Sequence, residues 1–465
     1  MGIFKAYDVR GLYPEQLNAA VAYRIGFGFA RHLAEDTAAP KVCVGMDARP
    51  SSPVLVQAFC DGLVAGGALP QFIGPCTTPM VYWAVAGRQD KAHGGAMITA
   101  SHNPARYNGI KFCREDAIPI SASSGLAEIE ALAEGAPAPQ AQWKSELRIN
   151  LEPYPGDVPA PLGFDTAIWA GYVQHLRRFV KRMPEGLSVA VDSANGMGGA
   201  YLGFLRGLGL KVHAIHGEMD GTFPNHEANP SKLENLQELS RLVRDSNSSL
   251  GIALDGDADR AVFIDEHATP VGQDMITALL GTELLRRGKG GAVLYDLRSS
   301  RAVAEAVEAA GGRAVRERVG HSFMKATMRK VGCVFGGELA GHYYFKDNFY
   351  ADSAILAVVE VLNAMGRASE PLSELVKPYK KYFQTGEVNF KVEDPEALFA
   401  KVADTFKDGK IDHLDGITVQ YDDWWFNLRA SNTEPLVRLN LEAASREQLK
   451  EKFEVLATVL GKSED

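Results

Sequence analysis

Short apolar runs alternate with amphipathic helical patterns along most of this 465-residue chain, and the alternation limits the folds that it can adopt. The apolar runs lie at 41–47, 71–76, 94–100, 188–194, 211–217, 249–255, 292–297, 313–319 and 333–338. Nearly continuous apolar strands separated by helices are typical of parallel sheets in α/β layers. Because the pattern returns twice after its first occurrence, the sequence predicts three related α/β domains in series.

Changes of composition indicate where these domains end. The proline-containing stretches at 134–139 and 152–161 are typical of linkers. Beyond about residue 383 the pattern changes to strands with helices between them, which predicts a smaller α+β domain at the C-terminus. The predicted domains are 1–155, 156–265, 266–382 and 383–465.

The composition excludes several classes of protein. The formal net charge of −9 argues against a nucleic-acid-binding protein, and it means that an anionic substrate needs a locally basic pocket. The five cysteines are scattered without a CxxC pair, as in reduced cytosolic proteins. No apolar run approaches the roughly 18 residues of a membrane span, and the N-terminal residues lack the apolar core of a signal peptide. We therefore expect a cytoplasmic enzyme that binds neither nucleic acid nor membranes.

A serine in a stiff turn is the first candidate for chemistry. Ser101 follows the apolar run at 94–100 in the segment TASHNP, where Pro104 restricts the backbone. A serine hydroxyl is a weak nucleophile unless a base or a metal activates it, and His102 and Lys111 are close in sequence. The alternative is a surface loop with Asn-Pro turn chemistry. The absence of a GxSxG segment at the serine disfavours an α/β-hydrolase.

Three alternating carboxylates follow the apolar run at 249–255. Asp255, Asp257 and Asp259 repel one another, and such a group favours a hard cation such as Mg²⁺. An EF-hand loop is disfavoured because Arg260 stands where that loop needs glycine. A DxDx[TV] phosphatase motif is disfavoured because its fifth position is aspartate here. A solvated acidic turn without a metal remains an alternative.

Two further segments carry groups that suit a sugar phosphate. One concentrates side-chain donors that fit a phosphate dianion, and these are Arg429, Ser431, Asn432, Thr433 and Arg438. The other is the glycine-rich segment 336–342, where Glu338 can accept hydrogen bonds from sugar hydroxyls. The alternatives are a polar hairpin and a glycine-rich turn. Parallel sheets bind ligands at the carboxyl ends of their strands, so one cleft between domains can collect the serine, the metal and the anion site. The combination indicates phosphoryl transfer.

Ten segments occur in an order that is specific as a set. They are KAYDVRG at 5–11, GMDAR at 45–49, TASHNP at 99–104, YNGIKF at 107–112, VDSANG at 191–196, DGTFPN at 220–225, DGDADR at 255–260, GHSFMK at 320–325, GGELAGH at 336–342 and RASNTEP at 429–435. Over almost the whole chain they resemble the α-D-phosphohexomutase family, and in particular its bacterial phosphomannomutase/phosphoglucomutase branch. The resemblance implies three α/β domains with mixed sheets and a smaller α+β C-terminal domain around a central active-site cleft.

The resemblance also implies a reaction. Ser101 carries a phosphoryl group, and one Mg²⁺ per chain is held by Ser101, Asp255, Asp257 and Asp259, with Arg260 beside it. The group passes to a hexose 1-phosphate, giving a 1,6-bisphosphate that turns over in the site and returns its other phosphate to the serine. Glucose or mannose 1,6-bisphosphate acts as activator, and the partners are small hexose phosphates. The enzyme is expected to be a monomer or a dimer.

Individual roles are carried over by motif. The candidate catalytic residues are Ser101, His102, Lys111, Arg10, Arg260 and His342. The candidate substrate-binding residues are Tyr7, Arg298, His321, Lys325, Glu338, Ala340, Arg429, Ser431, Asn432, Thr433 and Arg438. Arg298 stands where some relatives have lysine. Lys111 or His342 is expected to move the hydroxyl proton.

One departure from the family bears on the sugar. Ala340 stands where many relatives have serine, and a lost hydrogen bond is worth about 0.5–1.5 kcal/mol, so catalysis should survive while sugar discrimination changes. We expect a phosphomannomutase/phosphoglucomutase that prefers mannose phosphates. The alternatives are a phosphoglucosamine mutase, a metal-dependent sugar phosphatase and a sugar-phosphate sensor without turnover.

Overall fold

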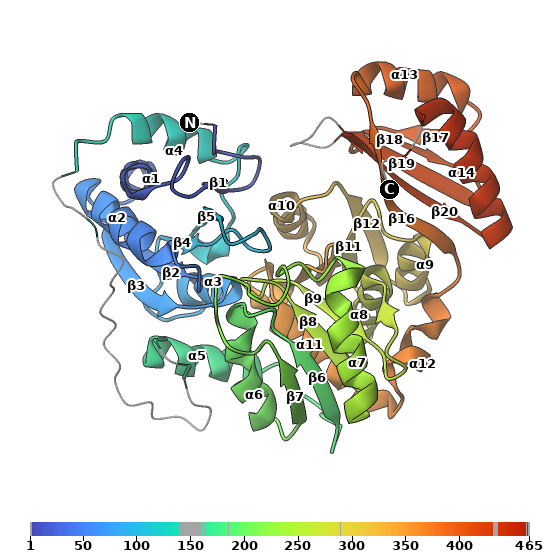
Figure 1. Ribbon diagram of the computed structural model, residues 1–465, viewed down its shortest axis with the longest axis horizontal. Coiled ribbons are helices and arrows are strands. Elements are labelled where there is room, and N and C mark those ends of the chain that lie inside the picture. The colour runs from blue at the N-terminus through green and yellow to red at the C-terminus, as the bar shows by residue number, and fades with distance from the viewer. Residues whose placement is uncertain are drawn as a thin grey trace.

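Four five-stranded sheets, each with its own helices, make up the computed structural model (Figure 1). It describes residues 2–139, 143, 160–161, 163–184, 186–288, 290–430, 436–461 and 463. The N-terminal unit is blue in Figure 1, the second is green, the third is yellow to orange, and the C-terminal unit is red. In the described part of the chain, no helix is long and apolar enough to cross a membrane.

The first sheet has the strand order β1-β5-β4-β2-β3. Its strands are β1 (Val9–Leu12), β2 (Lys41–Met46), β3 (Leu69–Pro75), β4 (Gly94–Ile98) and β5 (Tyr107–Arg114). The helices of this unit are α1 (Ala19–Leu33), α2 (Ser52–Ala65), α3 (Thr78–Ala86) and α4 (Leu126–Glu134). β2 pairs in parallel with β3 and β4, whereas β5 runs antiparallel to β4 and β1. The serine turn therefore follows β4 in the middle of the sheet.

The second sheet repeats this arrangement with the order β10-β9-β8-β6-β7. Its strands are β6 (Ser188–Asp192), β7 (Lys211–Ile215), β8 (Leu250–Leu254), β9 (Ala261–Ile264) and β10 (Pro270–Val271). Its helices are α5 (Thr166–Arg177), α6 (Tyr201–Gly207) and α7 (Gln237–Ser246). The aspartate loop joins β8 to the antiparallel β9.

The third sheet has the order β12-β11-β13-β14-β15. Its strands are β11 (Ala292–Asp296), β12 (Arg313–Glu317), β13 (Phe335–Gly337), β14 (Tyr343–Phe345) and β15 (Ala351–Asp352). Its helices are α8 (Gln273–Gly288), α9 (Arg301–Ala309), α10 (His321–Val331), α11 (Ala354–Ala368) and α12 (Leu372–Val376). In each of the three sheets one strand (β2, β6 or β11) lies between two parallel neighbours, and antiparallel strands extend the sheet at one edge. The prediction of three related α/β domains with mixed sheets is confirmed.

The fourth sheet is entirely antiparallel, with the order β16-β20-β19-β18-β17. Its strands are β16 (Phe383–Lys391), β17 (Lys410–Asp412), β18 (Ile417–Gln420), β19 (Trp424–Ala430) and β20 (Leu436–Ala443), and its helices are α13 (Pro395–Thr405) and α14 (Arg446–Leu460). This unit has a hydrophobic core of its own, which includes Phe390, Phe426 and Leu439. The predicted smaller α+β domain is thus present.

One continuous core joins the first three units. It runs from Trp83 on α3 through Tyr172 on α5 and Phe204 on α6 to Val358 on α11. Helix α3 itself starts at a cap in which the Thr77 side chain accepts a hydrogen bond from the backbone N–H of Met80. This packing fixes the N-terminus of α3 beside the aspartate loop of the second unit.

Candidate active site

The serine turn and the aspartate loop meet although they belong to different sheets. Ser101 is buried and its φ is +53°, in the left-handed region, which aims its hydroxyl out of the turn that follows β4. Its Oγ donates a hydrogen bond of 2.9 Å to Oδ2 of Asp255. A Cβ at position 256 would lie 2.4 Å from the carbonyl oxygen of Ser101, so only glycine permits this approach.

Arg49 holds the serine turn in place. Its Nη2 donates to the carbonyl oxygens of Ser101 at 2.8 Å and Asn103 at 2.7 Å, and its Nη1 donates to that of Pro104 at 2.8 Å. Its Nε pairs with Asp47 at 2.9 Å, and the side chain is fully buried. Arg49 lies in the segment GMDAR but was not among the predicted site residues.

Lys111 binds two of the three aspartates. Its Nζ lies 2.6 Å from Oδ2 of Asp257 and 2.6 Å from Oδ2 of Asp259. Thr78, at the start of α3, donates from Oγ1 to Oδ2 of Asp257 at 2.6 Å, a contact that the sequence analysis did not foresee. Lys111 lies on β5, opposite Met97 of the antiparallel strand β4, and from there its side chain reaches these carboxylates.

The carboxylate cluster fits a cation with oxygen ligands. Oxygen atoms from Asp255, Asp257 and Asp259 lie within 4.8 Å of one another. Oδ1 of Asp257 and Oδ1 of Asp259 are buried without a hydrogen-bond partner among the described residues. Burial and then the charges of Asp259 and Asp257 raise the pKa of Asp255 well above its usual value. Mg²⁺ satisfies such oxygens and relieves their repulsion, so the donor set fits this ion.

The charges around the cluster are fixed by their neighbours. Burial alone acts to lower the pKa of Lys111, but the carboxylates of Asp257 and Asp259 outweigh it, so the pKa is raised and the ammonium persists at neutral pH. For His102, burial and then the charges of Arg260 and Arg10 lower the pKa well below its usual value. His102 is therefore a neutral imidazole, and its Nδ1 lies 3.3 Å from Oγ of Ser101.

A second chain of polar contacts extends from the aspartate loop into the third unit. The Nε of Arg260 donates to Nε2 of His342 at 2.9 Å. This bond leaves the proton on Nδ1 of His342, which lies 2.8 Å from Oδ2 of Asp352. Oδ1 of Asp352 lies 2.7 Å from Nζ of the fully buried Lys325. Asp352 was not among the predicted residues.

The N-terminal candidates line the same region. Arg10 on β1 donates from Nη1 to Oδ1 of Asn103 at 2.7 Å, next to the serine turn. Tyr7 donates to the carbonyl oxygen of Val319 at 3.0 Å, and its ring centroid lies 5.5 Å from that of His321. Burial and then the charge of Lys325 lower the pKa of His321 well below its usual value.

Glu338 is engaged by the protein itself. Its Oε1 accepts a hydrogen bond of 3.0 Å from the backbone N–H of Gly320, and its Oε2 accepts one from Tyr344. Ala340 lies partly buried in the turn that begins at Glu338. These contacts fix the carboxylate at the start of α10, and each oxygen keeps a second lone pair for a further donor.

Three arginines from two units converge on one carboxylate. Arg429 on β19 and Arg438 on β20 are opposite one another in the fourth sheet, and Arg298 follows β11. They lie 2.8, 3.2 and 3.7 Å from oxygens of Glu387. Burial acts to raise the pKa of Glu387, but the guanidinium groups outweigh it and lower the pKa. Glu387 was not predicted, and Ser431, Asn432 and Thr433 lie outside the described residues.

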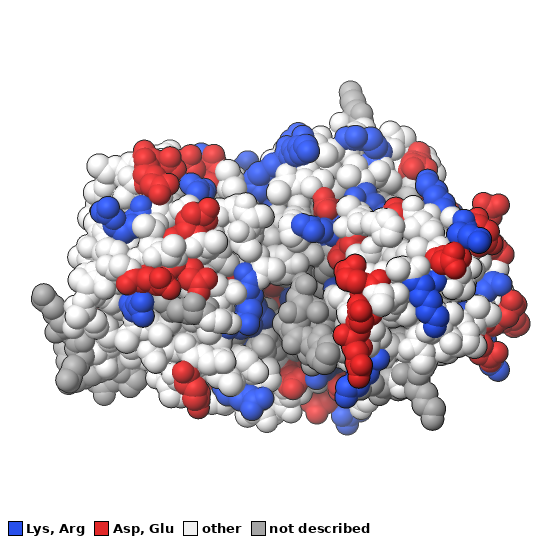
Figure 2. All heavy atoms as spheres, turned by 90° about the horizontal axis from the view of Figure 1, so that it is seen from above, with Lys and Arg blue, Asp and Glu red and all other residues white. Residues whose placement is uncertain are grey.

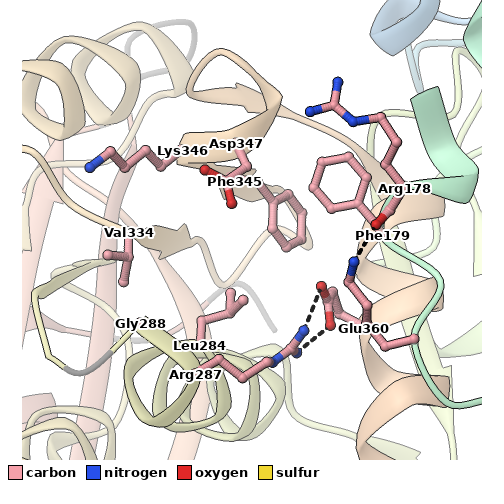
Figure 3. Close-up of a pocket in the computed structure, with 11 residues that line it drawn as sticks. Arg178, Phe179, Leu284, Arg287, Gly288, Val334, Phe345, Lys346, Asp347 and Glu360 are labelled. Carbon is pink, nitrogen blue, oxygen red and sulfur yellow. Dashed lines mark hydrogen bonds and ion pairs between the residues drawn. The ribbon is translucent and has the colours of Figure 1, made fainter.

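Basic side chains gather near the middle of one face of the molecule. Figure 2 shows blue Lys and Arg side chains on both sides of the middle of this face. A separate cavity of about 910 Å³ lies elsewhere, between Arg178 and Phe179 at the end of α5 and Arg287 on α8 (Figure 3). None of the predicted site residues lines it. A search by cavity size alone would therefore not locate the carboxylate cluster.

The described candidates thus form two groups. One group is a network of side chains around the serine turn, formed by Ser101, His102, Lys111, Arg10, Arg260, His342, Lys325 and the three aspartates. Arg298, Arg429 and Arg438 surround Glu387, and Glu338 acts electrostatically on both Tyr7 and Arg298. A hydroxyl beside a carboxylate cluster, a fixed ammonium and a group of arginines together suit phosphoryl transfer.

Comparison with known proteins agrees with this chemistry. Family models described as phosphoglucomutase/phosphomannomutase alpha/beta/alpha domains I, II and III and C-terminal domain match residues 1–138, 170–269, 272–382 and 387–459. A phosphomannomutase of Methanocaldococcus jannaschii is 35% identical over 99% of this chain and 98% of its own length. A Xanthomonas campestris pv. campestris protein named phosphohexose mutases is 36% identical over 94% of each.

Solved structures share the fold. The phosphoglucomutase/phosphomannomutase family protein of Burkholderia thailandensis has a TM-score of 0.85 and 28% identity, covering 98% of this chain and 96% of its own. Aspergillus fumigatus N-acetylphosphoglucosamine mutase, solved with GlcNAc-6P and magnesium, has a TM-score of 0.57 and 16% identity over 98% and 96% of the two chains, and it shows the fold alone. The chain belongs to the α-D-phosphohexomutase family. It is therefore a phosphohexomutase, an intramolecular phosphotransferase of the isomerase class.

Proposed function

We propose that this phosphohexomutase interconverts hexose 1-phosphates and hexose 6-phosphates through a phosphoserine at Ser101, with mannose phosphates preferred and glucose phosphates accepted. The observation that carries the proposal is the Ser101 hydroxyl, 2.9 Å from Asp255 within a cluster of three carboxylates. The names of the M. jannaschii and X. campestris relatives support mannose and a broader hexose range, respectively.

Ser101, Asp255, Asp257 and Asp259 are the residues that would hold Mg²⁺. When bound, Mg²⁺ supplies charge neutralisation to a phosphoryl group in transfer. Lys111 supplies a second positive charge at the same place, because its ammonium lies 2.6 Å from both Asp257 and Asp259. Arg49 keeps the serine turn in register through its bonds to backbone carbonyls.

The transfer needs a proton acceptor and a proton donor. The O–P bond at Ser101 breaks while a P–O bond forms to the free sugar hydroxyl. The sugar hydroxyl gives up one proton, and the released Oγ of Ser101 takes up one proton. We propose that His102, whose neutral Nδ1 lies 3.3 Å from Oγ, accepts the Oγ proton when the phosphoryl group returns to the serine and gives that proton back when the group leaves. Lys111 is a charge donor rather than a base, because its pKa is raised. His342, engaged by Arg260 and Asp352, orients Arg260.

The substrate's second phosphate is proposed to bind Arg429, Arg438 and Arg298. Guanidinium groups recognise phosphate through paired donors, and here a phosphate would compete with Glu387 for them. Ser431, Asn432 and Thr433 remain predicted members of this site. Glu338, held by Gly320 and Tyr344, is proposed to accept bonds from ring hydroxyls, while Tyr7, His321 and Lys325 border the sugar.

The test is ³¹P NMR of the protein with Mg²⁺ and a trace of glucose 1,6-bisphosphate. Mannose 1-phosphate, glucose 1-phosphate and glucosamine 1-phosphate are offered separately to the wild type and to Ser101→Ala. We expect 6-phosphates from mannose first and glucose second, without free phosphate. Ser101→Ala should lose most of this activity, because no oxygen carries the phosphoryl group, while substrate binding measured by calorimetry persists.

Each other outcome selects a different function. Release of free phosphate indicates a sugar phosphatase, and conversion of the glucosamine compound alone indicates a phosphoglucosamine mutase. Binding without conversion indicates a sensor. Turnover by Ser101→Ala at the wild-type rate would exclude the covalent route.

A further inference from the structure

Three metal-binding side chains gather in the second unit, outside the network around Ser101. Asp192 is the last residue of β6, and His216 directly follows β7, its parallel neighbour. His226 comes from the loop that leads from β7 toward α7. Ligand atoms of the three residues lie within 4.8 Å of one another, and the two imidazole rings have centroids 5.2 Å apart. The carboxyl ends of two parallel strands thus place these side chains at one edge of the sheet.

The hydrogen bonds of His226 leave a lone pair aimed at a carboxylate. Its Nδ1 lies 2.8 Å from the carbonyl oxygen of Glu227, which can only accept, so Nδ1 carries a proton. In the neutral ring, Nε2 is then an acceptor, and it lies 3.0 Å from Oδ2 of Asp192. The same carboxylate is oriented through Oδ1 by the backbone N–H of Ala194 at 2.8 Å. Two acceptors at this distance need a cation or an added proton.

We propose that Asp192, His216 and His226 form a second divalent-metal site, suited to Zn²⁺ and distinct from the carboxylate cluster beside Ser101. Two imidazoles and one carboxylate are a ligand set that zinc accepts, with a fourth position left for water. The carbonyl of Glu227 and the amide of Ala194 act as the outer partners that orient such ligands. Glu238, 2.9 Å from Nε2 of His216, orients the third ligand.

The distances between the ligand atoms suit a metal as well as an ion pair. Zinc–nitrogen and zinc–oxygen bonds of about 2.0–2.2 Å put ligand atoms roughly 3.0–3.6 Å apart, so the Asp192–His226 pair already has the required spacing. Without a metal, a protonated His226 would satisfy Asp192 as an ion pair, and His216 would bind only Glu238 of these groups. The ligand atoms of His216 already lie within 4.8 Å of those of Asp192 and His226, so a small movement of its ring would complete the set.

A metal here would fix the loop that supports the serine turn. The loop between His216 and His226 contains Gly221, where a Cβ would lie 2.3 Å from the backbone of Arg49, and Phe223, whose ring centroid lies 4.9 Å from the Arg49 guanidinium. Arg49 in turn binds the carbonyl of Ser101. The proposed metal site would therefore stabilise structure. It is linked to Ser101 by two contacts, that of its loop with Arg49 and that of Arg49 with the carbonyl of Ser101.

The experiment is calorimetric titration of Zn²⁺ into the full-length, chelator-treated protein in excess Mg²⁺, which occupies the carboxylate cluster. Wild type, His226→Gln and His216→Gln are compared with His267→Gln, a matched control whose exposed imidazole lies 3.3 Å from Glu266. We expect one tight zinc in the wild type and the control. Loss of either ligand should weaken it by about 100-fold or more.

A second measurement does not depend on the variants folding. Co²⁺ added to the wild type in excess Mg²⁺ should give the strong visible absorption of a low-coordinate site with imidazole ligands, and added Zn²⁺ should abolish it and raise Tm. Equal zinc affinity in all four proteins overturns the proposal. So does a wild type that binds no zinc and gives only weak, six-coordinate Co²⁺ absorption, which would leave an imidazolium–carboxylate pair.

Discussion

Several fully buried charged side chains in this molecule are held in ion pairs within one structural unit. Lys325 on α10 is fully buried and pairs with Asp352 at 2.7 Å, and Arg49 is fully buried against Asp47 at 2.9 Å. Removal of one partner from such a pair leaves an uncompensated buried charge, which typically costs about 3–5 kcal/mol. Asp257 and Asp259 also pair with Lys111, but the Oδ1 atom of each is buried without a hydrogen-bond partner among the described residues, and these two atoms face the proposed metal position.

His175 on α5 gives a prediction about acid stability. It donates from Nε2 to Asn348 at 2.8 Å, and burial lowers its pKa below the ordinary value of about 6.5, although the Asn348 bond partly opposes the shift. Below about pH 6.5 the unfolded chain then binds more protons than the folded chain, so folding free energy is lost as the pH falls. One such group contributes a slope of up to about 1.4 kcal/mol per pH unit.

The measurement is urea unfolding of the wild type and His175→Gln between pH 7.5 and 5.5. We expect the wild type to lose stability on acidification more steeply than the variant, because the variant lacks the buried imidazole. His267→Gln, at an exposed position, should follow the wild-type slope. Parallel curves for wild type and His175→Gln would mean that this imidazole does not resist protonation.

Among single residues, the sequence was informative where the signal is local. Ser101 and the three aspartates stand in short motifs whose residue types and spacing are chemical in themselves. Asp352 and Glu387 were missed because their significance depends on partners far along the chain, such as Lys325 and Arg429. No spacing rule relates a carboxylate in one strand to an arginine several elements away.

At the scale of elements, the apolar strands were predictable and several antiparallel ones were not. The runs that become β2, β4, β6 and β8 are long enough to be read from periodicity. The two-residue strands β10 and β15 are too short to show a period, and they form only because a neighbouring strand offers its edge. Strand β15 nevertheless matters for the candidate site, since it places Asp352 beside His342.

The close approach of two loops gives a prediction at this scale. A Cβ at position 256 would lie 2.4 Å from the carbonyl oxygen of Ser101, a backbone atom that cannot swing aside. Gly256→Ala should therefore separate the serine turn from the aspartates by a fraction of an ångström to an ångström. A misplacement of about 1 Å in such a site lowers the rate about 100-fold.

Steady-state kinetics with mannose 1-phosphate measure this effect as kcat/KM. Gly288→Ala, at an exposed position where nothing lies within 4 Å of an added Cβ, is the matched control and should keep wild-type activity. Thermal unfolding of both variants separates a local displacement from general loss of structure. A fully active Gly256→Ala would show that the two loops do not need this approach.

At the scale of the whole molecule, the cores divide the chain unevenly. The first three units share one continuous core, and the first unit has a second core around residues such as Phe59, whereas the C-terminal unit packs its own core around residues such as Phe426. The two bodies meet through polar contacts, among them Arg301, which donates from its backbone to Glu442 at 3.1 Å and from Nη1 to the carbonyl of Asp422 at 2.6 Å. Arg298 and Glu387 form another such contact at the proposed phosphate site.

This division predicts two calorimetric transitions rather than one. Phe204→Ala and Phe426→Ala are matched truncations of fully buried rings, one in the shared core and one in the C-terminal core. Each should cost its own body about 3–5 kcal/mol. Because the two cores are separate, Phe426→Ala should lower only the transition of the C-terminal unit, and Phe204→Ala only the larger transition. A single transition that both variants shift alike would mean that the polar contacts around Arg301 couple the four units into one cooperative body.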